Sequence, residues 1–416
     1  MSERLGHDHR SDSQGSVGIN FGAMTIAGTK NCVERNMFSL LLFFFRWNHG
    51  HCFFWGASKS RVSHHGPTDS ERRSWSGQLT SLRESSSPPW CREGWYDDAS
   101  FSVQTAKCEN TLSSPRLWLE NHPDGVYTVL RVEWADTVEA AQIWGLDFHM
   151  DRLEHSFRKA YPKSNDAVDF ENARTKTLSI LQELLKEAKV ARISNNDERE
   201  LFMATLLWVP SKELGLNIKG HLLRRLLSDP APPATPLVGT LAPTVTPNRY
   251  DSGLADCKLS SWCSARRPLE DEFRDSKDPN PQEVILTIPR HGGLNLLEGL
   301  TSNLFVLYPG GVVRTALTSH VLPGFARTMT IACLEEAGYL VDTESPISIE
   351  DAPLWKQVFV TSAIQLVVPV RQIRYHGASI WELDAETSET DLSSLLRATI
   401  LEQCKRWKQE LAVNRR

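Results

Sequence analysis

The stretch GGLNLLEGLTSNLFVLYPGG, residues 292–311, carries the clearest fold signal in the chain. Its apolar residues fall into short runs around positions 296–300 and 304–307, bounded by Gly-Gly and by Pro-Gly-Gly. Such runs between turn residues are typical of buried strands. Glu298 stands among them, and a buried carboxylate is costly unless a positive group meets it. Two partners remain open at this point: a core Arg or Lys, or a cationic group of a bound molecule.

Composition narrows the class of protein. The chain has 416 residues, a formal charge of −5, 40% hydrophobic and 23% charged residues. These values are typical of a soluble globular protein with two or three domains, and they disfavour a nucleic-acid binder or a polybasic membrane surface. Eight cysteines are scattered without a CxxC pair. That pattern argues against a structural zinc site and a disulfide scaffold, and it favours a reducing compartment.

Residues 1–110 differ from the rest of the chain. They are rich in Ser, His, Arg and Gly and show no sustained helical or strand period. We expect a disordered extension here. The apolar run MFSLLLFFF, 37–45, is far shorter than the roughly 20 residues that span a bilayer. The protein is therefore expected in the cytoplasm, or in an organelle if the extension is a targeting segment.

Regular structure is predicted to begin near Asp124. A small α/β domain is expected over 115–250, with strands at 125–136 and 200–210 and amphipathic helices at 147–161 and 171–189. Asp147 is the expected N-cap of the first helix. The proline-rich segment 228–253 reads as a linker. A larger domain is expected over 254–380, followed by a C-terminal amphipathic helix over 381–416.

Three features of the larger domain point to one kind of ligand. The first is Glu298. The second is the helix start VLPGFAR, where the backbone N–H groups of Phe325 and Ala326 can hold a phosphate. The third is the small polar turn TSA at 361–363. A phosphate site beside a buried carboxylate suggests a phosphorylated cofactor with a protonatable nitrogen.

Four motifs in register resemble a known family. They are LLEGLTSNLFVL, RTALTSHVLPGFAR, VFVTSAIQLVVPV and, upstream, DGVYTVLRVE followed by DFHMDRLEHS. Together they resemble the class IV, or fold-type IV, pyridoxal-phosphate enzymes, which include branched-chain and D-amino acid aminotransferases and 4-amino-4-deoxychorismate lyases. The resemblance implies an α/β (α+β) fold of two lobes, pyridoxal 5'-phosphate as cofactor, and a homodimer.

The resemblance also implies roles for individual residues. Glu298 would pair with the cofactor's pyridine nitrogen, and Lys258 would form the Schiff base and carry the substrate's α-proton. Lys277, in a charged loop, is expected at the surface. The remaining implied positions are the phosphate contacts Arg152, Phe325, Ala326, Ser362 and Ala363, and Tyr127 lining the active site from the small lobe.

Some positions depart from the family pattern. Trp262 and Cys263 stand where several relatives carry Tyr or Arg, and Ala363 stands where many aminotransferases carry Thr. Three functions therefore remain open. The leading one is amino transfer between an amino acid and a 2-oxo acid; the alternatives are a lyase of the aminodeoxychorismate type and an inactive family member. No metal, nucleic-acid or membrane site is expected.

Overall fold

The computed structural model describes residues 90–108, 114–134, 141–193, 200–213, 215–225, 236–242, 253–290, 293–383, 392–403 and 408–411. All of them belong to one compact unit, residues 83–416. The apolar run 37–45 lies outside the described residues. Among the helices that are described, none is long and apolar enough to cross a membrane.

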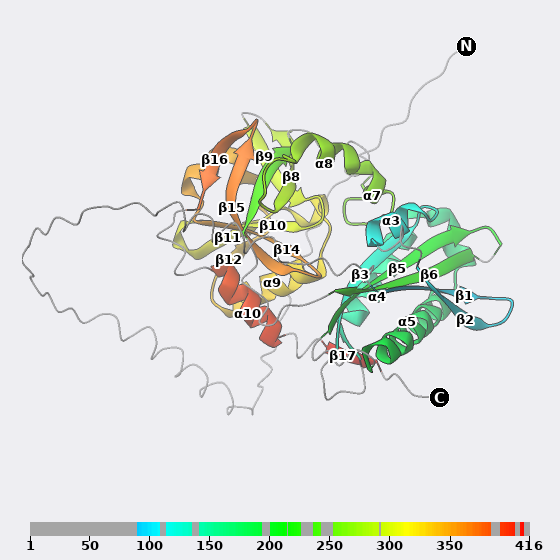
Figure 1. Cartoon of the computed structure of the whole chain (residues 1–416). Coiled ribbons are helices and arrows are strands. Elements are labelled where there is room, and N and C mark those ends of the chain that lie inside the picture. Colours follow the sequence, from blue (N-terminus) through cyan, green and yellow to red (C-terminus); the bar gives the residue numbers. More distant parts are fainter. Residues whose placement is uncertain are drawn as a thin grey trace, which may run out of the picture. The chain divides into compact units, whose positions relative to one another are not determined.

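The unit contains two lobes, each built on its own sheet (Figure 1). The elements of the small lobe are β1 (Cys91–Asp97), β2 (Ser102–Lys107), α3 (Pro115–Glu120), β3 (Val126–Trp134), β4 (Ala141–Trp144), α4 (Leu146–Ala160), the 3-10 helix η3 (Pro162–Ala167), α5 (Phe170–Ile193), β5 (Glu200–Ser211), β6 (Gly215–Arg225) and β17 (Lys408–Leu411).

The elements of the large lobe follow β6 in the chain. They are β7 (Leu237–Ala242), α7 (Trp262–Ala265), α8 (Arg267–Phe273), β8 (Gln282–Arg290), β9 (Gly293–Gly299), β10 (Asn303–Leu307), η4 (Pro309–Gly311), β11 (Val312–Thr315), η5 (Thr318–His320), α9 (Phe325–Glu336), β12 (Leu340–Asp342), β13 (Ile347–Ser348), η6 (Ile349–Leu354), β14 (Gln357–Ser362), β15 (Leu366–Tyr375), β16 (Ala378–Glu382) and α10 (Leu392–Gln403).

The small-lobe sheet has seven antiparallel strands in the order β17-β4-β3-β5-β6-β1-β2. Helices α4 and α5 pack against it, and their apolar stripes form one core with the strands. In α5 the stripe is Ile180, Leu181, Leu184, Leu185 and Ala188, all fully buried. This helical spacing places the side chains on one face. The predicted small α/β lobe is therefore observed.

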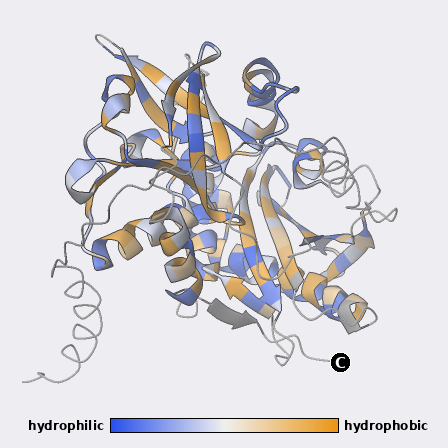
Figure 2. Ribbon diagram, turned by 60° about the vertical axis from the view of Figure 1, so that its left-hand side comes forward, coloured by the Kyte–Doolittle hydropathy of each residue, from blue (hydrophilic) through white to orange (hydrophobic). Residues whose placement is uncertain are grey.

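The large-lobe sheet runs β12-β11-β10-β14-β15-β7-β8-β9-β13, and β16 pairs with β15. An additional pairing between β9 and β10 closes six of these strands into a ring. Hydrophobic residues recur along the strands of both sheets (Figure 2). The runs around 296–300 and 304–307 form β9 and β10, as their sequence predicts, and both strands are buried.

Three expected boundaries are wrong. Residues 91–107, assigned to the extension, form β1 and β2 of the small-lobe sheet. Within the expected linker 228–253, β7 lies between β15 and β8 and pairs in parallel with both. The C-terminal helix ends at Gln403, and 408–411 is a strand on β4. In each case the segment forms a strand because it pairs with a strand that is distant in the sequence. The local sequence pattern does not show which strand that is.

The N-cap of α4 is Gly145, not Asp147. Gly145 has φ +62°, in the left-handed region that favours glycine. It also lies against the large lobe: a Cβ at this position would come within 2.2 Å of Phe325 Cε2, at the start of α9. Glycine at 145 therefore serves both the turn into α4 and the close contact between α4 and α9.

Candidate functional site

A cavity of about 980 Å³ lies between the lobes and is lined by residues of both. All eight residues singled out from the sequence line it: Tyr127, Arg152, Lys258, Glu298, Phe325, Ala326, Ser362 and Ala363. They come from β3 and α4 of the small lobe and from the Lys258 loop, β9, α9 and the β14–β15 turn of the large lobe. The fold thus brings these residues to one place.

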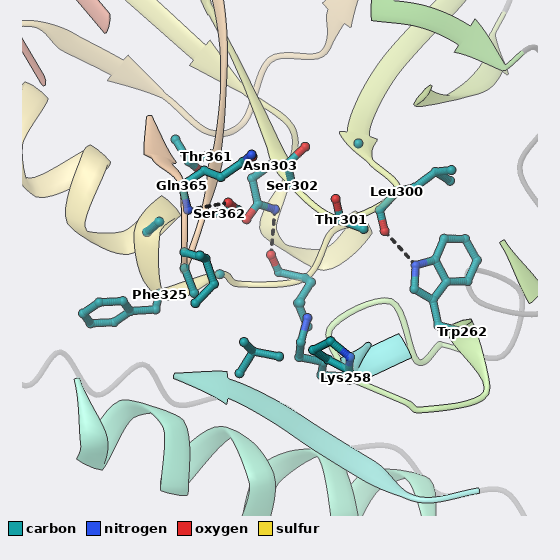
Figure 3. Close-up of a pocket in the computed structure, with 18 of the residues that line it drawn as sticks. Lys258, Trp262, Leu300, Thr301, Ser302, Asn303, Phe325, Thr361, Ser362 and Gln365 are labelled. Atoms are coloured by element: carbon teal, nitrogen blue, oxygen red, sulfur yellow. Dashed lines mark hydrogen bonds between the residues drawn. The ribbon is translucent and has the colours of Figure 1, made fainter. Parts of the chain in front are cut away.

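Glu298 lies in the buried part of β9, residues 295–299, and is 3% exposed. Its Oε2 accepts hydrogen bonds from Asn303 Nδ2 and from the backbone N–H of Leu322, each at 3.1 Å. Figure 3 shows this contact from Asn303 together with the residues around it. The charge on Glu298 also raises the pKa of the Arg327 guanidinium, against the larger lowering caused by burial. The two hydrogen bonds therefore fix the orientation of the Glu298 carboxylate, which lines the cavity.

Arg152 is a buried cation on α4, 7% exposed. Its Nη2 donates to Thr128 Oγ1 at 2.6 Å and lies 3.0 Å from His149 Nδ1. Among the described residues it makes no ion pair, and its buried Nε has no hydrogen-bond partner. Burial lowers the pKa of Arg152 to about 10. A guanidinium in this state is suited to an anion such as a phosphate.

His149 supports Arg152 from the core. It is fully buried, and its Nδ1 lies 2.7 Å from Thr128 Oγ1. Burial, and then the positive charges of Arg152 and Lys258, lower the pKa of His149 well below its usual 6.5. The neutral ring can accept a hydrogen bond from Arg152, which fixes the direction of the guanidinium.

Lys258 lies in a loop that is attached to β3 of the small lobe. The Tyr127 backbone N–H donates to the Lys258 carbonyl at 2.9 Å, and the Gly125 N–H donates to Ser260 Oγ at 2.9 Å. The Lys258 Nζ sits over the Tyr127 ring, 4.8 Å from its centroid. This cation–π contact places the amine inside the cavity and gives Tyr127 a position at the site. Lys277 lies on the exposed loop expected for it.

Two of the three positions that depart from the family pattern, Trp262 and Cys263, follow Lys258 by four and five residues. The Trp262 indole N–H donates to the Leu300 carbonyl at 2.9 Å, which ties α7 to the turn after β9. Cys263 is buried, and burial raises the pKa of its thiol, while nearby positive charges and a hydrogen bond with Tyr127 act against that rise. Both residues line the cavity.

The polar end of the cavity is formed by α9 and the β14–β15 turn. Phe325 and Ala326 are the first two residues of α9, whose N-cap is Gly324. A Cβ at Gly324 would lie 2.4 Å from Asn303 Oδ1, so the backbone passes close to the side chain that holds Glu298. Across the cavity, Thr361 Oγ1 is buried without a hydrogen-bond partner in the described residues.

Sequence reasoning missed several residues here. Glu283 is a second buried carboxylate, with a pKa raised by burial. It accepts hydrogen bonds from the backbone N–H of Leu300 and the hydroxyl of Ser302, and so holds the turn that follows Glu298. Four further arginines line the cavity: Arg116, Arg131, Arg266 and Arg397. Their contacts depend on tertiary structure, and no local motif marks them.

The donor set fits pyridoxal phosphate. An amine, a buried carboxylate and an anion-binding end face one cavity, and the buried Arg152 and Thr361 have polar atoms with no protein partner in the described residues. A phosphate would meet both. Loss of buried hydrogen bonds is costly, so such atoms commonly mark a ligand position.

Known proteins resemble this chain in one segment of its sequence and in its fold. The family model described as amino-transferase class IV matches residues 272–373. No curated protein matches the sequence. A fold IV-transaminase from Curtobacterium pusillum shares 20% identity over 75% of this chain and 99% of its own, with a TM-score of 0.51. A T.th. branched-chain amino acid aminotransferase, solved with pyridoxamine 5'-phosphate, shares 15% identity over 79% of this chain and 100% of its own, with a TM-score of 0.53.

The structural likeness covers both lobes, and the family match covers β8 to β15, including Glu298, the start of α9 and the β14–β15 turn. Residues 272–373 thus match the class IV aminotransferase model, and the chain shares the two-lobed fold of these two solved transaminases.

Proposed function

We propose that the protein transfers an amino group between an amino acid and a 2-oxo acid, with pyridoxal 5'-phosphate held in the cavity between the lobes. The observation that carries this proposal is the meeting of Lys258, Glu298 and Arg152 in one cavity. Bound pyridoxal phosphate supplies an electron sink for the substrate's α-carbon. The remaining work falls to the residues of this chain.

Lys258 is the amine that binds the cofactor covalently and afterwards takes and returns the substrate's α-proton at Nζ. The Lys258 amine lies over the ring of its neighbour Tyr127, and this contact positions it. Glu298, oriented by Asn303 and Leu322, keeps the cofactor's ring nitrogen protonated, because a carboxylate stabilises a proton on a nitrogen beside it. Arg152, the first N–H groups of α9 and the turn at 361–363 would hold the phosphate.

The arginines at the cavity favour substrates with more than one carboxylate. Arg116 and Arg266 pair with Glu120 and Glu270. In contrast, Arg397 makes no ion pair among the described residues, and its NH groups donate to the carbonyls of Gln365 and Val367.

Arg397 lies beside Arg131, which donates to the Ile364 carbonyl at 2.6 Å. Burial, and then the charge of Arg131, lower the pKa of Arg397. Arg131 already pairs with Glu133 at 2.7 Å, so a substrate carboxylate beside Arg397 would offset the repulsion between the two guanidiniums. A dicarboxylic amino donor satisfies this requirement.

A lyase of the aminodeoxychorismate type is the second candidate function, because the same cavity residues would serve it. Aminodeoxychorismate also carries two carboxylates, and its pyruvate elimination uses the same amine and the same cofactor. The two functions differ in their products, so one experiment separates them.

Purified protein is mixed with pyridoxal phosphate, and the absorbance of the bound cofactor is recorded. The holoprotein is then given amino acids with 2-oxo acids in one series and aminodeoxychorismate in another. We expect cofactor uptake and a new amino acid in the first series. Pyruvate and 4-aminobenzoate in the second series alone would favour the lyase. Protein that takes up no cofactor would contradict both functions.

A further inference from the structure

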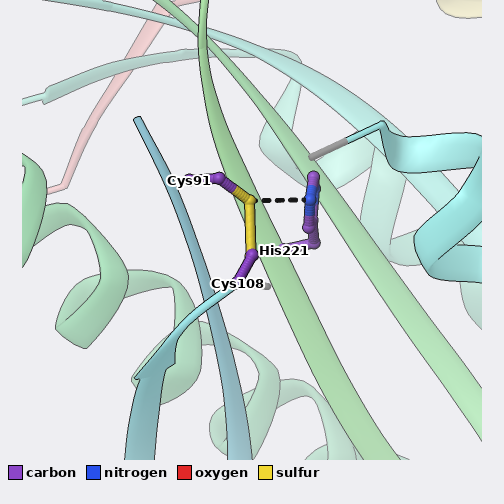
Figure 4. Close-up of side chains that lie close together, drawn as sticks. All are labelled: Cys91, Cys108 and His221. Atoms are coloured by element: carbon purple, nitrogen blue, oxygen red, sulfur yellow. Dashed lines mark hydrogen bonds between the residues drawn. A yellow bond between two sulfur atoms is a disulfide. The ribbon is translucent and has the colours of Figure 1, made fainter. Parts of the chain in front are cut away.

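A group of sulfur and nitrogen ligands lies in the small lobe apart from Lys258 and Glu298. Cys91 opens β1, Cys108 directly follows β2, and His221 lies in β6 (Figure 4). The hairpin of β1 and β2 brings the two cysteines together, and they are joined as a disulfide. In the pairing of β1 with β6, Leu223 lies opposite Cys91 and His221 lies opposite Glu93, and the His221 ring reaches the Cys91 sulfur diagonally. The sequence argued against a disulfide scaffold, and Cys91–Cys108 is one disulfide in the part of the chain that the structure describes.

The three side chains have the geometry of a ligand set. Cys91 Sγ lies 3.1 Å from His221 Nε2, and the three ligand atoms are all within 4.8 Å of one another. All three residues are buried: Cys91 and Cys108 are 5% exposed and His221 is 0% exposed. The Trp118 ring packs against the imidazole, with centroids 5.2 Å apart, and so limits its rotation. The set is therefore rigid as well as compact.

We propose that the reduced form of this cluster binds one thiophilic d10 cation, Zn²⁺ or Cu⁺, and that the disulfide form does not. Two thiolates and an imidazole are the ligands that these ions prefer. Three protein ligands suffice for trigonal Cu⁺ and leave one position of tetrahedral Zn²⁺ to water. The spacing of 17 and 113 residues between these ligands matches no sequence motif for a metal, because the sheet alone brings them together.

The two states exchange by a balanced step. A two-electron reductant, a dithiol in a cell or a phosphine in vitro, gives two electrons to the Cys91–Cys108 bond. The S–S bond breaks and each sulfur takes up one proton. The dithiol supplies the two protons and closes to a disulfide, whereas the phosphine takes an oxygen from water, whose two protons go to the sulfurs, and becomes its oxide. Metal binding then displaces the two thiol protons, and His221 binds through Nε2 in its neutral form.

The cluster adjoins the wall of the cavity. Cys91 and Cys108 pack with Met203 and Leu223, and Val129 and Ile364 pack against the same group. Of these, Met203, Val129 and Ile364 line the cavity. A bound ion would hold the open end of the β1–β2 hairpin to β6 and keep that wall in place. The disulfide joins only the two ends of the hairpin.

The test uses the full chain in two redox states. One sample is reduced with a phosphine under argon, the other is oxidised until thiol counting shows the loss of one pair. Each is titrated with Zn²⁺, with Cu⁺ and with Co²⁺, whose thiolate charge-transfer absorbance reports on sulfur ligands. We expect the reduced protein to bind one more equivalent than the oxidised protein, with thiolate bands for Co²⁺ and a higher Tm when Zn²⁺ is added.

Variants locate the extra ion. The double variant C91S/C108S and the variant His221→Asn should each lose that one equivalent, whereas Cys333→Ser, at a buried thiol far from the cluster in the fold, should keep it. Metal held by the histidines of residues 1–89 binds in both redox states and cancels in the difference. Equal binding by reduced and oxidised wild-type protein would overturn the proposal, even if a variant failed to fold. An extra equivalent that persists in C91S/C108S would also overturn it.

Discussion

Glu298 and Asn303 are the one residue pair through which β9 and β10 meet. The same two residues are joined a second time by their side chains, at 3.1 Å, and Asn303 also donates to the Leu322 carbonyl at 2.8 Å. The same two residues thus close the large-lobe sheet and orient the Glu298 carboxylate. A change at Asn303 acts on both.

We expect the Glu298→Gln variant to bind the cofactor and to have a lower kcat than the wild type. A charge-assisted hydrogen bond contributes about 1.5–3 kcal/mol, so kcat should fall roughly ten- to hundredfold. Steady-state kinetics of the holoprotein measure this, with the exposed Glu335→Gln as the matched control. An unchanged kcat in Glu298→Gln would show that the carboxylate does not act on the cofactor ring.

Lys258→Ala should abolish turnover and the absorbance of the covalently bound cofactor. The reason is that no other described lysine lines the cavity. Reversible binding of pyridoxal phosphate should persist. Lys277→Ala, on the exposed loop, is the control and should behave as wild type. If Lys277→Ala loses the absorbance instead, the assignment of the reactive amine is wrong.

Arg152→Met should weaken binding of pyridoxal phosphate by about one to two orders of magnitude, from the loss of charge-assisted hydrogen bonds to the phosphate. Pyridoxal without the phosphate should bind to wild type and variant alike, which separates this role from a general loss of structure. Fluorescence titration of the apoprotein gives both affinities. Arg158→Met, an exposed position on the same helix, should change neither.

Stability should fall as the pH drops below about 6.5. His149 has a folded pKa well below 6.5, so in that range the unfolded chain binds a proton that the folded chain does not. One such proton weakens folding by up to about 1.4 kcal/mol per pH unit. Denaturant unfolding at pH 7 and at pH 5 measures the loss. His149→Asn should lose less over this range, although His122, whose pKa is also lowered, keeps some of the slope.

Arg397→Met should lower the turnover of dicarboxylic amino donors more than that of aliphatic ones. Turnover of a dicarboxylic amino donor should fall about tenfold or more, whereas turnover of an aliphatic amino acid should stay within a factor of about two, because only the first presents a second carboxylate. The ratio of kcat/KM values reports this change. Arg371→Met, on an exposed part of β15, serves as the control. Equal losses for both donors would contradict a carboxylate subsite at this position.

The sequence predicted the local elements that carry Glu298 and Phe325 better than the edges of the fold. Glu298 and the Pro323-Gly324 helix start lie in short motifs whose local structure is set by neighbouring residues, and these motifs were placed correctly. Strands β1, β7 and β17 were missed, because each depends on a partner strand far away in the chain. The close approach of Gly145 to Phe325 is a tertiary contact, and no local pattern includes it.

The order of elements along the chain has a consequence for protein engineering. The small-lobe sheet takes its strands from 91–225 and then, after the whole large lobe, from 408–411. β17 covers the outer edge of β4, which would otherwise expose its backbone N–H and C=O groups. A gene shortened after α10 would leave that edge bare, and its product is expected to self-associate through β4. A purification tag is therefore better attached to the N-terminus.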